Sequence, residues 1–234
     1  MLGEAVLGSL GGAAALMTYA VRAPSSTILG PSIYRGSTMR RSIALTFDDG
    51  PSEGTLTILR ILEEYRVPAT FLQCGANVRR LPDIARLVVS NGHEVGNHTE
   101  THPNFCFQSS QFIAEEFWRA QLTMENIVGR SPSLMRAPFG ARWFGFREVQ
   151  RDLNLLGVMW TVIAKDWKLS APAIAKRLER RASNGAIFCL HDGRELQRSP
   201  DVFATAEALR ILIPSLLKSG FQFETVTGIQ CQKN

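Results

Sequence analysis

The chain is poor in histidine and in cysteine: its 234 residues include only four of each. The cysteines form no Cys-x-x-Cys pair, which excludes a zinc ribbon and a thioredoxin-like motif. Cys74 and Cys189 lie in short apolar runs typical of buried strands, so we expect free core thiols rather than disulfides. If the protein uses histidine in catalysis, the candidates are few: His93, His98, His102 and His191.

The chain also lacks a basic domain, although its net charge is +5. Residues 1–41 contain four Arg and one Glu, which leaves 22 basic and 20 acidic residues in the rest of the chain. A domain that binds nucleic acid carries its positive excess itself, so we expect no nucleic-acid partner. Apolar residues make up 45% of the sequence and charged residues 20%, which predicts one folded domain of ordinary size.

Residues 5–21 contain no charged side chain. As a helix they would span about 25 Å, the low end for a membrane helix. No basic residue precedes this run, which disfavours a signal peptide and leaves a signal anchor or a helix packed on the protein surface. We expect residues 1–22 to form an apolar helix and candidate signal anchor, residues 23–41 a linker, and residues 42–234 the domain. This organisation predicts export to, or anchoring in, the cell envelope, with the cytoplasm as the alternative.

From Ser42 onward, short apolar runs alternate with amphipathic stretches. The alternation predicts an α/β fold with a parallel sheet, open or closed into a barrel, and about seven strand–helix units. The expected strands are 43–47, 69–73, 93–96, 134–136, 157–163, 186–190 and 221–226. The expected helices are 56–65, 81–91, 110–129, 144–155, 171–182 and 202–219.

Polar side chains follow these strands at the points where they end, which is where ligand sites lie in parallel α/β folds. An Asp-Asp pair before Gly-Pro is usually a turn, and a His after a strand is often a core residue. A turn at the Asp-Asp pair does not explain why the residues after the other strands are polar too. We therefore expect these polar residues to form one site together. His93 stands at a strand start, and we expect it to be structural. The expected site residues are Asp48, Asp49, His98, His102, Arg136, Asp166, Trp167 and His191.

Five short motifs contain these residues: TFDDGP (46–51), HTETH (98–102), RAPFG (136–140), DW (166–167) and LHD (190–192). In this order they resemble the motifs of the polysaccharide deacetylases, the NodB-homology carbohydrate esterases. The resemblance covers about residues 42–227. It implies a distorted, incomplete (β/α)7 barrel. It also implies metal-dependent removal of N- or O-acetyl groups from the sugars of chitin, peptidoglycan, xylan or a related polymer.

The resemblance implies one divalent metal, usually zinc, with cobalt or nickel as alternatives. Asp49, His98 and His102 would be its ligands. Two His and one carboxylate leave coordination positions open for water and for the acetyl oxygen. A cation at this place acidifies the water and polarises the carbonyl.

The resemblance also assigns the proton transfers. Asp48 would be the general base, oriented by Arg136. His191 would be the general acid that protonates the leaving sugar atom, and Asp166 would favour its cationic form. The cation would neutralise one of the two adjacent carboxylates and Arg136 the other.

On the substrate side, Trp167 and Leu190 would wall a pocket for the acetyl methyl, and the backbone N–H of Phe139 would donate to the oxyanion. The sequence departs from the family at Ile163, which stands where an Asp is common, three residues before the Asp-Trp pair. This departure weakens the network expected around Arg136.

Two other functions remain open. A metal-independent amidase acting on small C–N substrates is disfavoured, because both histidines of the second motif and Asp49 are present. A non-catalytic sugar-binding relative could lose Asp48 or His191 freely, yet both are present. The expected partner is an acetylated carbohydrate polymer or oligomer, and the expected oligomeric state is a monomer.

Overall fold

The computed structural model describes residues 2–230, with side chains described from Gly11 onward. The strands are β1 (Ser32–Ile33), β2 (Ser42–Asp48), β3 (Thr70–Gln73), β4 (Glu94–Asn97), β5 (Leu134–Met135), β6 (Leu156–Val158), β7 (Val162–Ile163), β8 (Ala186–His191) and β9 (Gln222–Phe223). The α-helices are α1 (Leu2–Arg22), α2 (Thr55–Tyr65), α3 (Gly75–Arg80), α4 (Pro82–Ser90), α5 (Ser110–Val128), α6 (Phe146–Asp152), α7 (Ala171–Glu179), α8 (Phe203–Lys218) and α9 (Val226–Gln230). A 3₁₀ turn covers Pro138–Gly140.

Helices α2, α4, α5 and α8 lie within one residue of their expected bounds at both ends. Local signals explain this agreement. The Ser109 side chain caps α5 by accepting a hydrogen bond from the Phe112 N–H, and Gly129 ends the helix with a φ of 68°. Helices α6 and α7 are shorter than expected, while α3 and α9 carry no clear sequence signal and were not expected.

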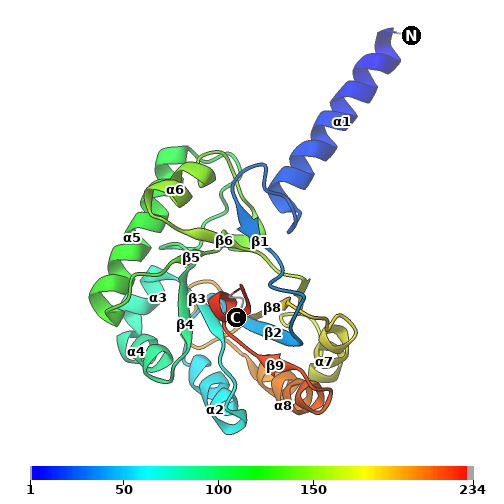
Figure 1. Cartoon of the computed structure of the whole chain (residues 1–234). Coiled ribbons are helices and arrows are strands. Elements are labelled where there is room, and N and C mark those ends of the chain that lie inside the picture. The colour runs from blue at the N-terminus through cyan, green and yellow to red at the C-terminus, as the bar shows by residue number, and fades with distance from the viewer. Residues whose placement is uncertain (1, 231–234) are drawn as a thin grey trace.

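The strands form one curved parallel sheet in the order β1-β6-β5-β4-β3-β2-β8-β7, and β9 adds to β2. Strands β6 and β7 follow each other along the chain but lie toward opposite ends of this order. The sheet therefore curls until its two edges approach each other, with the helices around its outside (Figure 1). This is the expected distorted, incomplete barrel.

The single strand expected at 157–163 is wrong, because residues 159–161 leave one edge of the barrel and join the other. The Met159 N–H donates to the Ile33 carbonyl, whereas the Thr161 N–H donates to the Ile187 carbonyl of β8. Trp160 lies between these two contacts, at the gap in the barrel wall.

Residues 32–36 help to close this gap, so this part of the expected linker belongs to the fold. β1 pairs with β6 in parallel, and Arg35 forms an antiparallel bridge with Ala186 at the start of β8. The Tyr34 carbonyl accepts a hydrogen bond from the Thr161 hydroxyl. The Ser, Pro and Gly content of residues 23–40 favours a linker. Composition gives no information about these backbone pairings.

Strands β2 and β8 position the site through their two-residue side-chain period. Their register pairs Asp48 with His191 and Thr46 with Cys189, so these side chains share the interior face of the barrel. The alternate residues face outward: Phe47 and Leu190 are fully buried in the main core beneath α2, α7 and α8. A buried parallel strand thus presents chemistry on one face and packing on the other.

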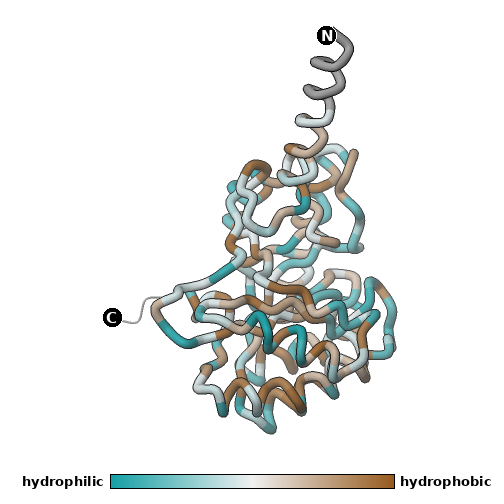
Figure 2. The backbone as a smooth tube through the Cα atoms, turned by 90° about the vertical axis from the view of Figure 1, so that its right-hand side faces the viewer, coloured by the Kyte–Doolittle hydropathy of each residue, from teal (hydrophilic) through white to brown (hydrophobic). Residues whose placement is uncertain are grey.

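Of helix α1, the last turn packs on the barrel, where Ala20 and Val21 are buried. The preceding part, from Gly11, extends away from the barrel and exposes Leu16 and Tyr19 (Figure 2). Within residues 2–230, no helix has the length and hydropathy needed to cross a membrane.

Candidate active site

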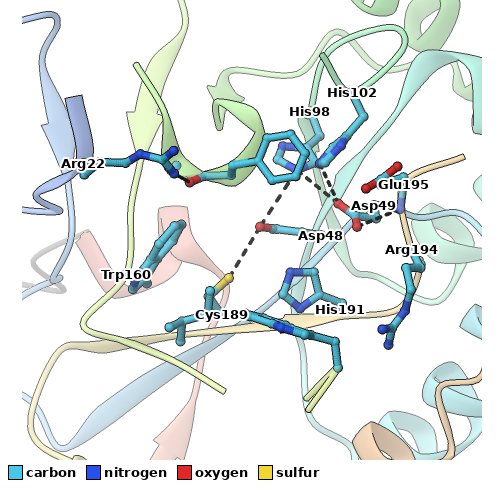
Figure 3. A pocket seen from close by; sticks show the side chains of 15 residues that line it. Arg22, Asp48, Asp49, His98, His102, Trp160, Cys189, His191, Arg194 and Glu195 are labelled. Carbon is cyan, nitrogen blue, oxygen red and sulfur yellow. Dashed lines mark hydrogen bonds and ion pairs between the residues drawn. The ribbon is translucent and has the colours of Figure 1, made fainter. Parts of the chain in front are cut away.

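A cavity of about 460 Å³ opens at the carboxyl ends of the strands (Figure 3). The predicted strand-end residues Asp48, Asp49, His98, His102 and His191 all line it. Phe139 and Trp167 also line the cavity, and each is 48% exposed. The fold therefore brings these strand-end side chains to one cavity, while the expected site residues Arg136 and Asp166 lie behind its wall, bonded to Asp48 and His191.

Asp49 faces two histidines from the loop after β4. Its Oδ1 lies 3.3 Å from His98 Nε2 and 3.1 Å from His102 Nε2. Its Oδ2 accepts a hydrogen bond from the Glu195 N–H at 2.9 Å. Burial alone would raise the pKa of Asp49, but the hydrogen bonds and charges of the two histidines hold it well below its usual value.

The hydrogen bonds of His98 indicate that a cation belongs between these three side chains. His98 Nδ1 lies 2.9 Å from the Arg136 carbonyl, which can only accept, so Nδ1 carries the proton. When the ring is neutral, the lone pair of Nε2 points at an oxygen of Asp49, and two acceptors face each other. A metal ion between them would remove this conflict, and His98, His102 and Asp49 form the donor set typical of zinc.

Asp48 has a partner of its own in the fully buried Arg136. Arg136 Nη1 donates to Asp48 Oδ1 at 2.5 Å and to the Thr46 hydroxyl at 2.9 Å. The guanidinium also donates to the carbonyls of Val158 and Met159. Asp48 is thus oriented and charge-paired without any metal.

The substitution of Ile for the common Asp at position 163 does not leave Arg136 without partners. Every guanidinium nitrogen has a hydrogen-bond partner among the Val158 and Met159 carbonyls, the Thr46 hydroxyl and Asp48, and Ile163 instead lines the cavity. The Asp48–Arg136 pair is therefore held without an acidic side chain at position 163.

His191, on the strand next to Asp48, is paired with Asp166. His191 Nδ1 lies 2.8 Å from Asp166 Oδ1, and Asp166 Oδ2 accepts from the His191 N–H and from the Thr205 hydroxyl. Burial would lower the pKa of His191, but the hydrogen bond and charge of Asp166 raise it to about 9. The ring is therefore cationic at neutral pH, with Nε2 left for the cavity.

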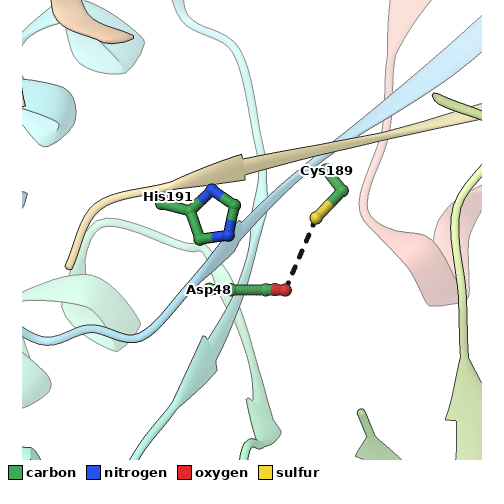
Figure 4. Close-up of side chains that lie close together, drawn as sticks. All are labelled: Asp48, Cys189 and His191. Carbon is green, nitrogen blue, oxygen red and sulfur yellow. Dashed lines mark hydrogen bonds between the residues drawn. The ribbon is translucent and has the colours of Figure 1, made fainter. Parts of the chain in front are cut away.

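A second group of metal-type side chains consists of Asp48, Cys189 and His191, whose ligand atoms lie within 4.8 Å of one another (Figure 4). Its charges do not favour a cation. Arg136 already pairs with Asp48, and burial, with the Asp48 charge, raises the pKa of the Cys189 thiol well above its usual value. The thiol donates to Asp48 Oδ2 at 3.4 Å instead.

The expectation that Leu190 walls the acetyl pocket is wrong. Leu190 alternates with Cys189 and His191 along β8, so its side chain faces the helices and is fully buried in the main core. Cys189 occupies the corresponding place on the cavity wall, together with Ile163 and Trp167.

Three residues that support the loops around the cavity were not predicted from the sequence. Asn77 donates from Nδ2 to the carbonyls of Asp49 and Glu195 and so connects the two loops. Glu116 accepts the N–H groups of the loop that carries the histidines. Nothing in the sequence around Asn77 or Glu116 singles them out.

Asp192 is the third, and it directly follows His191. Its Oδ2 accepts from the Thr55 hydroxyl, and its carbonyl accepts from the Ser52 hydroxyl, so it supports the loop after β2. Burial raises the pKa of Asp192 to about 7. Gly193 follows it, and any side chain there would meet the Asp49 backbone at 2.4 Å. Asp192 is part of the LHD motif, but the resemblance implies roles only for the Leu and the His of that motif.

His93, Cys74 and Cys106 do not line the cavity. His93 Nδ1 accepts from the Ala69 N–H, as expected of a structural residue, and burial lowers its pKa to about 4. Cys74, Cys106 and Cys189 are free thiols. Cys231 lies outside the described residues.

Comparison with known proteins now decides the family. The sequence model of the polysaccharide deacetylases matches residues 35–158. The chain belongs to the polysaccharide deacetylase family. Its fold agrees, because a crystal structure of the Bc1960 peptidoglycan N-acetylglucosamine deacetylase superimposes with a TM-score of 0.78 at 29% identity, over 84% of this chain and 91% of that one.

Two curated relatives act on different glycans. The peptidoglycan-N-acetylglucosamine deacetylase PgdA of Listeria monocytogenes is 31% identical over 210 residues, which are 89% of this chain but 42% of PgdA. The chitooligosaccharide deacetylase of Bradyrhizobium sp. is 34% identical over 191 residues, which are 78% of this chain and 87% of that protein. The chain therefore spans less than half of the Listeria relative.

Proposed function

We propose that this polysaccharide deacetylase is a metal-dependent hydrolase that removes acetyl groups from N-acetylglucosamine residues of peptidoglycan or of chito-oligosaccharides. One observation carries the proposal. A metal-type trio, a carboxylate paired with Arg136 and a cationic His191 face one cavity. Acetyl esters of other sugars, such as those of xylan, are the second substrate class to be tested.

Asp49, His98 and His102 would hold the divalent metal. Zinc suits two imidazoles and one carboxylate, and cobalt or nickel suits the same ligands. When bound, the metal supplies Lewis-acid polarisation of the acetyl carbonyl and a more acidic water.

Asp48 accepts the proton of the attacking water at Oδ2. Arg136 holds Oδ1, so Oδ2 is the atom that remains toward the histidines, 4.0 Å from His98 Nε2. Because Arg136 is fully buried and bonded to two backbone carbonyls, this orientation is fixed before substrate arrives.

His191 donates the proton from Nε2 to the leaving nitrogen of the sugar. Its pKa of about 9 keeps it protonated until that step, and Asp166 fixes the ring through Nδ1. The N–H of Phe139 donates to the oxygen that becomes negative as the water attacks. Trp167, Ile163 and Cys189 surround the acetyl methyl and exclude water.

Acetate release tests the proposal. The metal-free protein and the protein loaded with zinc, cobalt or nickel are incubated with chito-oligosaccharides, peptidoglycan and acetylated xylan, and acetate is quantified. We expect release from the first two substrates with metal only. Full activity in the metal-free protein would support a metal-independent amidase, and metal-dependent sugar binding without acetate release would support a non-catalytic binder.

We also place the protein, as a monomer, at the cell envelope, where a peptidoglycan substrate lies, with membrane association through residues 5–21. Fractionation of cells that express the full chain tests the location. Light scattering of the purified protein tests the monomer. Recovery entirely in the cytosolic fraction contradicts the placement.

A further inference from the structure

The chain between α1 and β1 is clamped onto the loop that carries Phe139. The Arg142 side chain, 1% exposed, donates to the carbonyls of Ala23 and Ser26, and its N–H donates to the Val21 carbonyl. Val21 also packs in a small apolar cluster with Ala141. This contact places the last residue of α1 at the cavity.

That residue is Arg22, which lines the cavity on the side opposite Arg194 and Glu195 (Figure 3). Its Nη1 donates to the Phe139 carbonyl at 3.0 Å. The bond is charge-assisted, because the donor is a guanidinium. Arg22 is exposed at the mouth of the cavity. Among the residues of α1 whose side chains are described, it is the one that lines the cavity.

Phe139 needs such external support. Its φ of 56° and ψ of 11° lie in the left-handed region, which costs a non-glycine residue of order 1 kcal/mol or more. The Gly140 N–H donates to the Ala137 carbonyl at 3.0 Å, and Arg22 holds the oxygen of the same peptide plane. Fixing this plane fixes Phe139, whose ring packs edge-on against His102 at 4.7 Å.

We propose that Arg22 is a positioning residue of the active site, supplied by the segment that precedes the region matched to the family, and that it holds Phe139 in its catalytic conformation. The inference rests on the proposed function, in which the Phe139 N–H donates to the developing oxyanion. Arg22 acts through Phe139 and touches no reacting atom.

The test compares Arg22→Ala and Arg22→Lys with a matched control, Arg147→Ala. Arg147 Nη2 donates to the carbonyls of Thr27 and Ile28, so it holds the same segment, but it does not line the cavity. With the zinc-loaded full chain and a chito-oligosaccharide, we expect Arg22→Ala to lower kcat about tenfold or more with little change in KM, because a misplaced donor acts on the transition state.

Two further readouts separate positioning from a general loss of structure. Hydrogen–deuterium exchange in residues 138–142 should accelerate in Arg22→Ala while the melting temperature stays near that of the wild type. Arg22→Lys, or added guanidinium ion with Arg22→Ala, should restore part of kcat. Arg147→Ala should leave both kcat and this exchange unchanged.

Wild-type kcat or wild-type exchange in Arg22→Ala overturns the inference, and so does an equal loss of kcat in Arg147→Ala. These outcomes differ from failure of the proposed function. In that case the wild-type protein itself releases no acetate with any metal, while the exchange comparison still reports whether Arg22 holds Phe139.

Discussion

Asp48 and Asp49 are neighbours in the sequence, yet the fold gives their carboxylates opposite surroundings. Asp48 is paired with a cation of the protein, the buried Arg136. Asp49 faces His98 and His102, and His98 presents a lone pair to it when neutral. One half of the cavity is electrostatically complete without a ligand, and the other is complete only with a cation.

In the proposed mechanism this difference gives each half of the cavity its own role. The half with Asp49 would bind the metal, whereas the half with Asp48 and Arg136 would move protons through groups whose partners are already in place. The two carboxylates should therefore respond differently to the same loss of charge, and the following predictions test that difference.

The largest effect should come from removing the metal or its ligands. A chelator, Asp49→Asn or His98→Ala should abolish acetate release, because the metal contributes several kcal/mol, about a thousandfold or more in rate. Zinc content measured by atomic absorption should fall in both variants, and added zinc should restore the chelated wild type. A variant at the structural histidine, His93→Gln, should retain its zinc. Full zinc content in Asp49→Asn would contradict the assignment of the two halves.

Asp48→Asn should separate catalysis from metal binding. Asn keeps an oxygen for Arg136 but cannot take a proton, so kcat should fall by about 10²–10⁴. Its zinc content should equal that of the wild type, in contrast to Asp49→Asn. If Asp48→Asn lost its zinc, Asp48 would be a ligand and the comparison between the two carboxylates would fail.

Asp166→Asn should change the pH dependence more than the maximum rate. In the wild type, His191 has a pKa of about 9, so activity should decline as the pH rises through that value. Without the Asp166 charge, burial dominates and lowers the pKa of His191, so this alkaline limb should move to lower pH. The pH profile of kcat measures the shift, and an unmoved limb would mean that another group controls it.

The same pair contributes to stability with a defined sign. Since the pKa of His191 is raised from 6.5 to about 9, its stabilisation is complete below about pH 6.5 and lost as the pH rises through about 9. Urea unfolding at pH 6 and pH 10 should show a larger loss of stability for the wild type than for Asp166→Asn.

The sequence predicted the barrel and most of the site because both depend on order along the chain. Short apolar runs that end just before Asp48 and His191 placed these residues at strand ends, and parallel strands bring such ends together. The partners that complete the site follow no such pattern. Asn77 in α3 supports the loops that carry Asp49 and Glu195, and Arg22 reaches the cavity from the end of α1. Both lie outside the five motifs and act through backbone carbonyls, which carry no sequence signal.

The wrong prediction for Leu190 concerns a residue inside one of the five motifs. It leads to the prediction with the smallest expected effect, in which Cys189 and Leu190 give different results. Cys189 lines the cavity and Leu190 the core, so only the former should control the size of the acyl group. Cys189→Ala should raise the rate on N-propionyl relative to N-acetyl substrates about tenfold, the value of roughly one methylene in an apolar pocket. Leu190→Val should leave this ratio unchanged and cost about 1 kcal/mol of stability, measured by urea unfolding. A change in this ratio with Leu190→Val but not with Cys189→Ala would show that Leu190 lines the acetyl pocket. The period of β8 makes the two outcomes exclusive, because neighbouring side chains in a strand cannot face the same side.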